Sequence, residues 1–232
     1  MIAPRVIPVL LIRDEGLYKG VRFRDHRYVG DPMNTSRIFN EKEPDEIFLL
    51  DISATAKRRT IPIDFVRRVA EECYMPFGVG GGIRNVDDAR RLLQAGAEKV
   101  VFNTAAVEDP VLVTRASEAF GAQSVVVSID VGRTFWGGRR VFTCSGTRRT
   151  RHDPVAWAAE AERRGAGEIL LTSIDRDGTR AGYDAGLVRA VADAVRIPVI
   201  ACGGAGSYRD LAGIVQAGAT AAAAGTIFVF HG

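Results

Sequence analysis

Residues 76–82 (PFGVGGG) and residues 198–204 (PVIACGG) decide the fold, because the same run of proline, apolar strand and glycine turn occurs twice, 122 residues apart. At that spacing, residues 46–49 return at 168–171, residues 94–97 at 216–219, and Thr104 as Thr226. Residues 6–11 lie over residues 125–130 at a spacing of 119. A repeat of this length indicates a duplicated unit that fills half the chain. We therefore predict a single domain over residues 1–232, with halves at about 1–120 and 121–232.

Each copy contains four short apolar runs that alternate with amphipathic segments. This alternation is typical of parallel βαβ units whose strands are buried on both faces. The predicted strands are residues 5–11, 46–51, 76–80, 99–102, 124–130, 168–173, 198–201 and 221–224. In the helix expected before Pro198, one apolar stripe is formed by Leu187, Val188, Val191 and Val195, as a helix that covers a sheet requires.

Two equal halves of four strands favour closure of the sheet. The predicted fold class is α/β, a (β/α)8 TIM barrel built from two duplicated half-barrels. An open doubly wound sheet is the alternative, but it gives no reason for the duplication, and no G-x-G-x-x-G motif follows the first strand. Because the chain stops soon after its eighth strand, at residues 230–232, we expect the last covering helix to be missing or truncated.

The composition excludes several classes of protein. With 47% hydrophobic and 25% charged residues among 232, the chain is globular in composition. Its apolar runs fall short of the ~20 residues that span a bilayer. Residues 1–16 read as a first strand rather than a signal peptide. We therefore expect a cytoplasmic protein with no membrane partner.

Cysteine, histidine and charge give few signals. Cys73, Cys144 and Cys202 lack C-x-x-C spacing and the three histidines are scattered, so we predict no disulfide, no metal site and no cofactor. The net charge of +3 decides little, and no nucleic-acid partner is expected. A basic cluster that could bind an anion, although such runs are more often solvated loop faces, comprises Arg139, Arg140, Arg148, Arg149 and Arg151.

Glycine turns follow the third and seventh predicted strands, at the end of a barrel where active sites lie. Their uncovered backbone N–H groups bind phosphate well at a helix start. One such turn could be a plain tight connection. Two in equivalent places predict anion sites on opposite sides of the mouth, and hence a ligand phosphorylated at both ends. The predicted phosphate-binding residues are Gly81, Gly82, Asn103, Thr104, Asp177, Gly178, Gly203, Gly204, Gly225 and Thr226.

Acid–base chemistry between two phosphates would need carboxylates at the mouth. Asp130 is the best placed, because it ends an apolar strand, although a carboxylate there could instead cap the following loop. The further candidates are Asp51, Asp175 and Asp177. Lys19 lies in the polar segment 13–31, which we interpret as a loop that either closes over a substrate as a lid or stays solvated.

At the other end of the barrel, four charged residues stand at the starts of predicted strands. They are Arg5, Glu46, Lys99 and Glu168. Two cations and two anions could ring the floor of the barrel. Geometry alone favours a salt-bridged plug that satisfies its charges, and the alternative is a gate.

Several segments together resemble the cyclase subunit of imidazole glycerol phosphate synthase, the histidine-pathway barrel that uses ammonia from a partner glutaminase. They are FGVGGGI (77–83), EKVVFNTAAVEDP (98–110), GAQSVVVSID (121–130), RRGAGEILLTSIDRDGT (163–179) and IPVIACGGAG (197–206). The resemblance covers all 232 residues.

The resemblance implies a role for each set of residues. It assigns one phosphate to Gly82, Asn103 and Thr104. It assigns the other to Asp177, Gly178, Gly204 and Thr226. The four floor charges become a gate over an ammonia channel. Because nothing in the chain resembles a glutaminase nucleophile with its histidine and glutamate, a glutaminase subunit is implied at the amino-terminal face of the barrel, unless free ammonia is used.

One position departs from the family. Its mechanism uses two aspartates, at the ends of strands one and five, as general acid and base. Asp130 matches the second, but the internal repeat places Leu11 where the first belongs. A leucine carries no proton, and losing an acid–base group typically removes ~10²- to 10⁴-fold in rate. Asp14 would have to reach back to substitute.

Three hypotheses stay open. The first is an enzyme that converts the phosphoribulosyl formimino carboxamide nucleotide and ammonia into imidazole glycerol phosphate. The second is an ammonia conduit that activates a glutaminase. Residues 5–19 and 28–52 look more like a paralogous branch from surface-polysaccharide gene clusters, where ammonia passes to a separate amidotransferase that modifies a sugar. The third is the sister isomerase barrel that acts on the precursor nucleotide, but the floor charges favour the cyclase branch.

Overall fold

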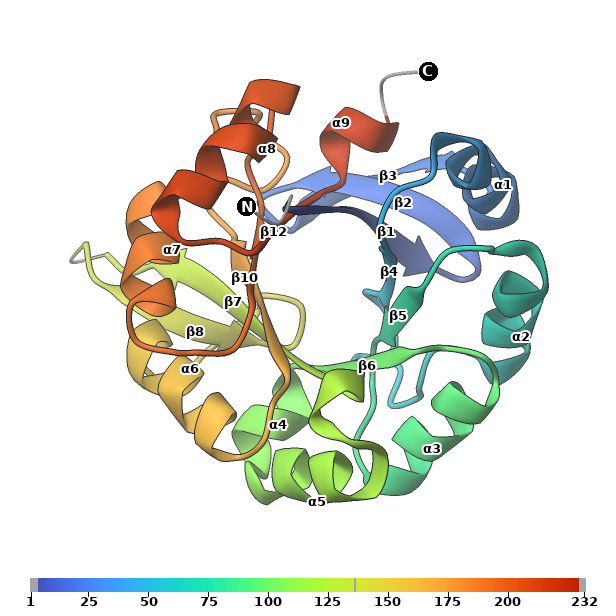
Figure 1. The fold of residues 1–232 in the computed structure, drawn as a ribbon, viewed down its shortest axis with the longest axis horizontal. Helices are drawn as coiled ribbons and strands as arrows, with labels where there is room; N and C mark the ends of the chain where they lie inside the picture. Colours follow the sequence, from blue (N-terminus) through green and yellow to red (C-terminus); the bar gives the residue numbers. More distant parts are fainter. Residues whose placement is uncertain (1–3, 136, 230–232) are drawn as a thin grey trace.

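The computed structural model describes residues 4–135 and 137–229, which form a closed barrel (Figure 1). Within these ranges the wall consists of parallel strands β1 (Arg5–Arg13), β4 (Ile47–Asp51), β5 (Phe77–Gly80), β6 (Lys99–Phe102), β7 (Val125–Arg133), β10 (Glu168–Ser173), β11 (Val199–Cys202) and β12 (Ala221–Ala224). They pair in this order, and β12 pairs with β1 to close the sheet. The predicted (β/α)8 fold is confirmed, with its eight strands close to their predicted bounds.

Helices cover the outside of the wall (Figure 1). They are α1 (Pro32–Lys42), α2 (Ile63–Glu72), α3 (Val86–Gln94), α4 (Thr104–Glu108), α5 (Val111–Phe120), α6 (Pro154–Arg163), α7 (Ala185–Ala192), α8 (Tyr208–Ile214) and α9 (Thr226–Val229), with 3-10 turns η1 (Ala122–Ser124) and η2 (Val215–Ala217). The predicted apolar stripe of α7 is buried at Leu187, Val188 and Val191. The expected truncation of the last helix concerns residues 230–232, which lie outside the described residues. Among the helices described, none is long and apolar enough to cross a membrane.

Each half also carries an antiparallel hairpin after its first strand. In the first half, β2 (Gly16–Val21) pairs with β1 and with β3 (Arg24–Gly30). In the second half, β8 (Arg139–Thr143) pairs with β7 and with β9 (Arg148–Arg149). The assignment of residues 13–31 to a loop is therefore wrong, and most of the arginine cluster lies on strands rather than in a loop, although Arg148 and Arg149 are exposed as a solvated face would be.

The first hairpin could not be predicted from the sequence, because its turns lack the residues that usually mark a turn. Its two turns place ordinary side chains at φ values between 48° and 61°, where asparagine or glycine is the usual sequence signal. These residues are Asp14, Glu15, Arg22 and Phe23.

The interior of the barrel is packed tightly. A buried cluster inside the wall contains Ile7, Val9, Phe48, Val101, Val126, Leu170, Ile200, Ala221 and Ala223. A larger cluster fills the space between the wall and the helices. Gly78 faces the inner cluster, where a Cβ atom would lie only 2.3 Å from Cε1 of Phe48. The glycine therefore makes room for the phenylalanine ring.

Replacing Gly78 by alanine should lower the free energy of unfolding by about 1–3 kcal/mol, because the added methyl group overpacks the interior. Gly213→Ala is the matched control. It lies in α8, where an added Cβ meets nothing within 4 Å, and it should stabilise the fold by roughly 0.5–1 kcal/mol. Urea unfolding followed by circular dichroism measures both values. Equal effects of the two substitutions would contradict this account of the packing.

Candidate active site

A closed ring of ion pairs lies at the floor of the barrel. The Arg5 guanidinium donates to Glu46 Oε2 at 3.1 Å and to Glu168 Oε1 at 2.7 Å. Lys99 Nζ lies 2.9 Å from Glu46 Oε2 and 3.0 Å from Glu168 Oε2. Each cation therefore contacts both anions. The structure brings the four predicted floor residues together.

Water reaches this ring mainly at Arg5, whose side chain is 29% exposed. The Glu46 side chain is 2% exposed and that of Lys99 is 14% exposed. Burial raises the pKa of Glu46 above its ordinary value, and the hydrogen bond from Lys99 opposes the shift. Glu46 Oε1 is buried without a hydrogen-bond partner among the described residues. An unsatisfied acceptor is costly in a purely structural plug.

Asp130 lies at the opposite end of the barrel, in β7. Asn103 Nδ2 donates to its Oδ2 at 3.1 Å, and Ser128 Oγ donates to its Oδ1 at 3.3 Å. Burial raises the pKa of Asp130 to about 7; the Ser128 hydrogen bond opposes this shift and the charge of Asp177 adds to it. A carboxyl group with a pKa near neutrality can both accept and return a proton.

Lys19 and Asp177 form a second buried pair at the mouth. Lys19 Nζ lies 2.9 Å from Asp177 Oδ1, and the two side chains are 5% and 11% exposed. Asp177 Oδ2 is buried and has no partner in the described part of the chain. Lys19 comes from β2 and Asp177 from the loop after β10, so the pair joins the two halves. The alternative of a solvated lysine does not hold.

The β2–β3 hairpin folds over the strand ends of the second half. Arg22 N donates to Asp177 O at 2.8 Å, and Arg22 Nε donates to Asp175 O at 3.2 Å. A Cβ atom on Gly178 would lie 2.4 Å from Gly20 O, so the glycine allows the two backbones to approach. The Asp175 carboxylate accepts the N–H of the last residue of β7, at 2.8 Å, and thereby ties this loop to the second hairpin.

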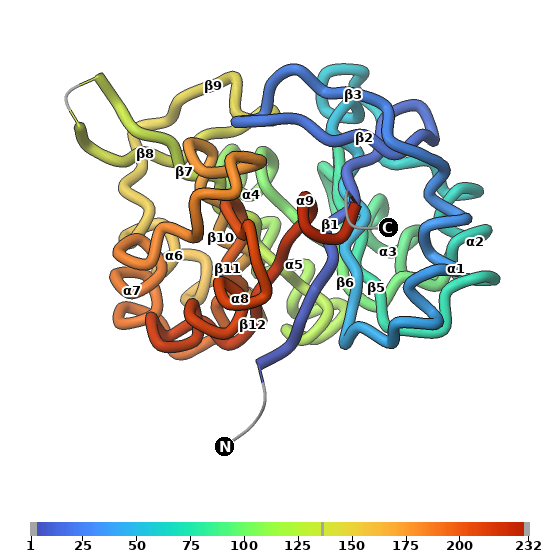
Figure 2. The backbone as a smooth tube through the Cα atoms, turned by 90° about the horizontal axis from the view of Figure 1, so that it is seen from above, coloured from blue at the N-terminus to red at the C-terminus, as the bar shows by residue number. Residues whose placement is uncertain are grey.

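The turn between β8 and β9 folds in the reverse direction, over the first half. Cys144 N donates to Thr104 Oγ1 at 2.9 Å, and Ser145 Oγ donates to Ile52 O at 3.0 Å. Figure 2 shows both hairpins at the same end of the barrel, opposite the beginning of β1. Sequence reasoning missed these contacts, although the glycine at position 146 was a signal for a turn.

In the glycine turns after β5 and β11, a neighbouring backbone carbonyl group leaves no room for a side chain. A Cβ atom would lie 1.8 Å from Arg59 O if added to Gly82, and 2.2 Å from Gly182 O if added to Gly204. Both glycines have positive φ, at +67° and +115°. Within residues 4–135 and 137–229, no acceptor receives the backbone N–H of Gly82 or Gly204. Neither donor therefore has a partner in the described part of the chain; Gly204 is buried and Gly82 is half-buried.

The other predicted phosphate-binding residues surround these turns. Gly81 and Gly203 precede them, and each is confined by the carbonyl oxygen of the neighbouring strand end, at 2.6 and 2.7 Å from an added Cβ. The side chains of Asn103 and Thr104 already contact Asp130 and the β8–β9 turn. Gly225 approaches Lys19, and the buried Thr226 begins α9. Phosphate binding at these residues stays a prediction.

Asp51 and Asp14 have other partners. Asp51 Oδ1 accepts the backbone N–H and hydroxyl of Ser53, both at 2.8 Å, and Oδ2 pairs with Arg59 at 2.6 Å. These contacts organise the loop that packs on Gly82. Asp14 is 59% exposed at the β1–β2 turn and pairs with Lys57. It therefore does not take the place of a carboxylate at position 11.

The mouth is apolar on one side and polar on the other. Leu11 pairs with Leu50 in the parallel register of β1 and β4, and both pack on the inner apolar cluster. The repeat places Asp130 and Thr172 at the equivalent positions of the second half. Cys202 lies on this polar side, where burial raises the pKa of its thiol to about 12. The repeat spacing of 122 residues could have indicated that Thr172 occupies, in the second half, the position that Leu50 has in the first.

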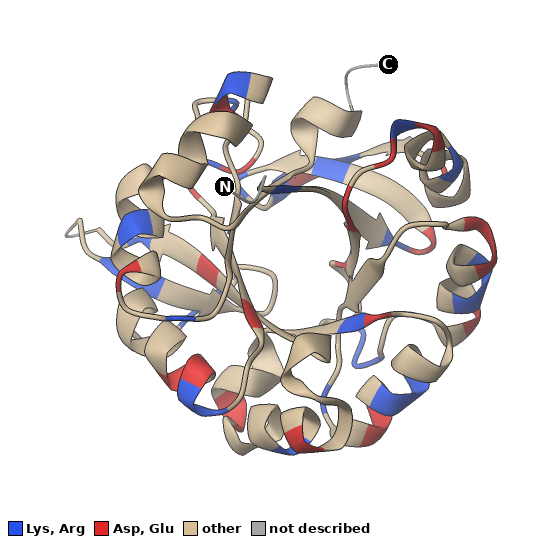
Figure 3. Ribbon diagram, in the orientation of Figure 1, with Lys and Arg blue, Asp and Glu red and all other residues tan. Residues whose placement is uncertain are grey.

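Charged residues lie mainly on the outer helices and hairpins of the barrel (Figure 3). Among the residues described, no group of three or more histidine, cysteine, aspartate or glutamate side chains is placed to share a metal ion.

Asp130 should make stability depend on pH. Its folded-state pKa of about 7 lies above its ordinary value of 3.8, so its contribution to stability is present at low pH and is lost as the pH rises through the folded-state value. Relative to wild type, Asp130→Asn should therefore gain up to roughly 4 kcal/mol between about pH 4 and about pH 8. Urea unfolding at a series of pH values measures this difference. Asp87→Asn, at a carboxylate 85% exposed, is the control; parallel curves for both variants would refute the assignment.

Comparison with known proteins agrees with this geometry. The family model described as "Histidine biosynthesis protein" matches residues 5–232. A Pseudomonas aeruginosa protein named "Putative imidazole glycerol phosphate synthase subunit hisF2" is 49% identical over 233 aligned residues, which cover 100% of this chain and 93% of that protein. The chain therefore belongs to the histidine biosynthesis family of (β/α)8 barrels, and within it resembles the cyclase subunit of imidazole glycerol phosphate synthase.

Proposed function

We propose that this barrel takes ammonia from a separate glutaminase and adds it to a ligand phosphorylated at both ends, as in the synthesis of imidazole glycerol phosphate. The observation that supports this most strongly is the position of Asp130, a carboxyl group with a pKa of about 7 at the mouth that also bears the two glycine turns. In this proposal the N–H groups of Gly82 and Gly204 hold the two phosphates.

Asp130 would transfer the protons. Addition of ammonia and closure of the imidazole ring require a proton to leave nitrogen and another to reach the departing group. Asn103 and Ser128 hold the carboxyl group in place for both steps. Lys19, buried against Asp177, would supply positive charge at the mouth.

Ammonia would enter through the floor. In this proposal a glutaminase subunit binds the amino-terminal face, and the ring of Arg5, Glu46, Lys99 and Glu168 opens to let ammonia pass. The unsatisfied Glu46 Oε1 supports a gate, because it leaves an acceptor that a passing ammonia molecule can satisfy.

A second candidate function is favoured by Leu11. With no carboxylate at that position, the barrel would keep its floor ring and anion turns but lose ring closure. It would then conduct ammonia and activate the glutaminase for a separate amidotransferase, such as one that modifies a surface-polysaccharide sugar.

Turnover separates the two functions. The purified barrel should consume the phosphoribulosyl formimino carboxamide nucleotide with ammonium at mildly alkaline pH, and Asp130→Asn should lower the rate by about 10²- to 10⁴-fold. Leu11→Asp should raise it, whereas Leu50→Asp, which adds a carboxylate to the neighbouring strand, should not. The loss of substrate absorbance measures all four proteins. Activity in Leu11→Asp alone would show that the missing carboxylate is the cause of the lost ring closure, as the second function requires. No activity in any of the four proteins would reject the cyclase proposal.

The gate has its own test. Lys99→Ala should change the output of the complex with glutamine as nitrogen source and leave the output with free ammonium unchanged, because only glutamine-derived ammonia crosses the floor. Glu98→Ala, at the exposed neighbouring residue, is the control and should change neither. Equal losses with both nitrogen sources would leave the ring as a structural plug.

A further inference from the structure

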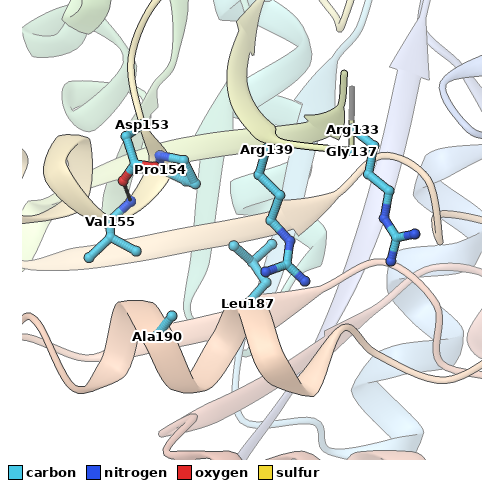
Figure 4. A pocket seen from close by; sticks show the side chains of 8 residues that line it. All are labelled: Arg133, Gly137, Arg139, Asp153, Pro154, Val155, Leu187 and Ala190. Carbon is cyan, nitrogen blue, oxygen red and sulfur yellow. Dashed lines mark hydrogen bonds between the residues drawn. The ribbon is translucent and has the colours of Figure 1, made fainter. Parts of the chain in front are cut away.

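A pocket of about 500 Å³ lies on the outside of the barrel wall, between the β7–β8 hairpin and helices α6 and α7 (Figure 4). The residues that matter here are Arg133, Arg139, Asp153, Val155, Leu187 and Ala190. None of them belongs to the floor ring or to the mouth. The pocket therefore calls for an explanation separate from the proposed reaction.

One side of the pocket is cationic. Arg133 and Arg139 stand directly opposite each other in the antiparallel pairing of β7 with β8 and line the same pocket. Like charges in such a pair are destabilising unless they are compensated. Arg139 is compensated, since its Nη2 lies 2.8 Å from both carboxylate oxygens of Asp184. The Arg133 guanidinium has no hydrogen-bond or ion-pair partner among the described residues.

The opposite side of the pocket is anionic. Asp153 caps α6, and its Oδ1 accepts the backbone N–H groups of Val155 and Ala156 at 3.0 and 3.1 Å. Its second oxygen has no partner among the residues described. Figure 4 shows Asp153 and Arg133 at opposite sides of the pocket, with the apolar side chains of Leu187 and Ala190 between them. A dianion would be repelled from this arrangement by Asp153 and Asp184.

We propose that this pocket binds an elongated zwitterion, a ligand whose carboxylate and ammonium groups are separated by an apolar chain. The carboxylate accepts hydrogen bonds from Arg133 and from the guanidinium nitrogens of Arg139 that Asp184 does not use. The chain lies on Val155 and Ala190, above the buried Leu187, and the ammonium group pairs with the free oxygen of Asp153. Arginine suits the first role, because its planar fork matches a carboxylate.

Calorimetric titration of the whole chain with 6-aminohexanoate tests the proposal, and hexanoate and hexylamine are the probes with one charge each. The zwitterion should bind saturably and at least about fivefold more tightly than either single-charge probe, since each charged contact adds to affinity. Binding of all three probes with equal affinity, or of none, would overturn the proposal.

Three variants locate the site. Arg133→Gln and Asp153→Asn should each weaken binding of 6-aminohexanoate by about tenfold. Asparagine retains the cap of α6, so the second variant keeps the fold. Arg151→Gln, at an exposed arginine outside the pocket, should leave the affinity unchanged. Thermal melting by circular dichroism establishes that the variants are folded. Unchanged affinity in folded Arg133→Gln and Asp153→Asn would place the ligand elsewhere and reject the site.

Discussion

Parallel pairing of β12 with β1 and of β7 with β10 closes the sheet, so that each strand of the wall pairs on both sides. A closed wall of eight strands has an interior just wide enough for side chains. Below the mouth, the inward positions that pack together are therefore apolar or very small, and charges at the floor must compensate one another. Phe48 fills the space that Gly78 leaves free. At the floor, a single buried charge would cost several kcal/mol, and the alternation of Arg5, Glu46, Lys99 and Glu168 is the arrangement that lets four charges stay there.

The duplication repeats the frame of the mouth but not its chemistry. Equivalent carbonyl groups cover the two glycine turns, and an equivalent hairpin follows the first strand of each half. Within this symmetric frame, the first half presents Leu11 and the second presents Asp130. The β2–β3 hairpin carries Lys19 across the mouth to Asp177. The first half therefore contributes a cation, rather than a carboxylate, to the polar side of the site.

Most of the wall and the floor ring could be predicted from the sequence, because strand periodicity appears in neighbouring residues and the repeat appears as matching segments 122 residues apart. The hairpins could not. The strand β3 has no buried residue and so shows no apolar alternation, and Arg22 and Phe23 give no turn signal. The partners of individual side chains could not be predicted either, since the ion pair of Lys19 and Asp177 joins positions 158 residues apart. For Asp51, its place at a strand end predicted proton chemistry, which stays a prediction; its contacts to Ser53 and Arg59 in the loop after β4 could not be foreseen.

The glycine turns need a more careful argument than their sequence suggests. Confinement by Arg59 O and Gly182 O explains Gly82 and Gly204 without any ligand, so the glycines alone do not indicate phosphate. The same backbone path directs two N–H groups away from every acceptor in the described part of the chain. Gly204 is buried, and a buried donor without a partner carries a free-energy cost. Gly82, at the equivalent place in the first half, is only partly buried, so this cost falls mainly on Gly204. A turn selected for packing alone has no reason to keep it there. The two unpaired donors, rather than the glycines, are therefore the stronger argument that the mouth binds an anion at each side.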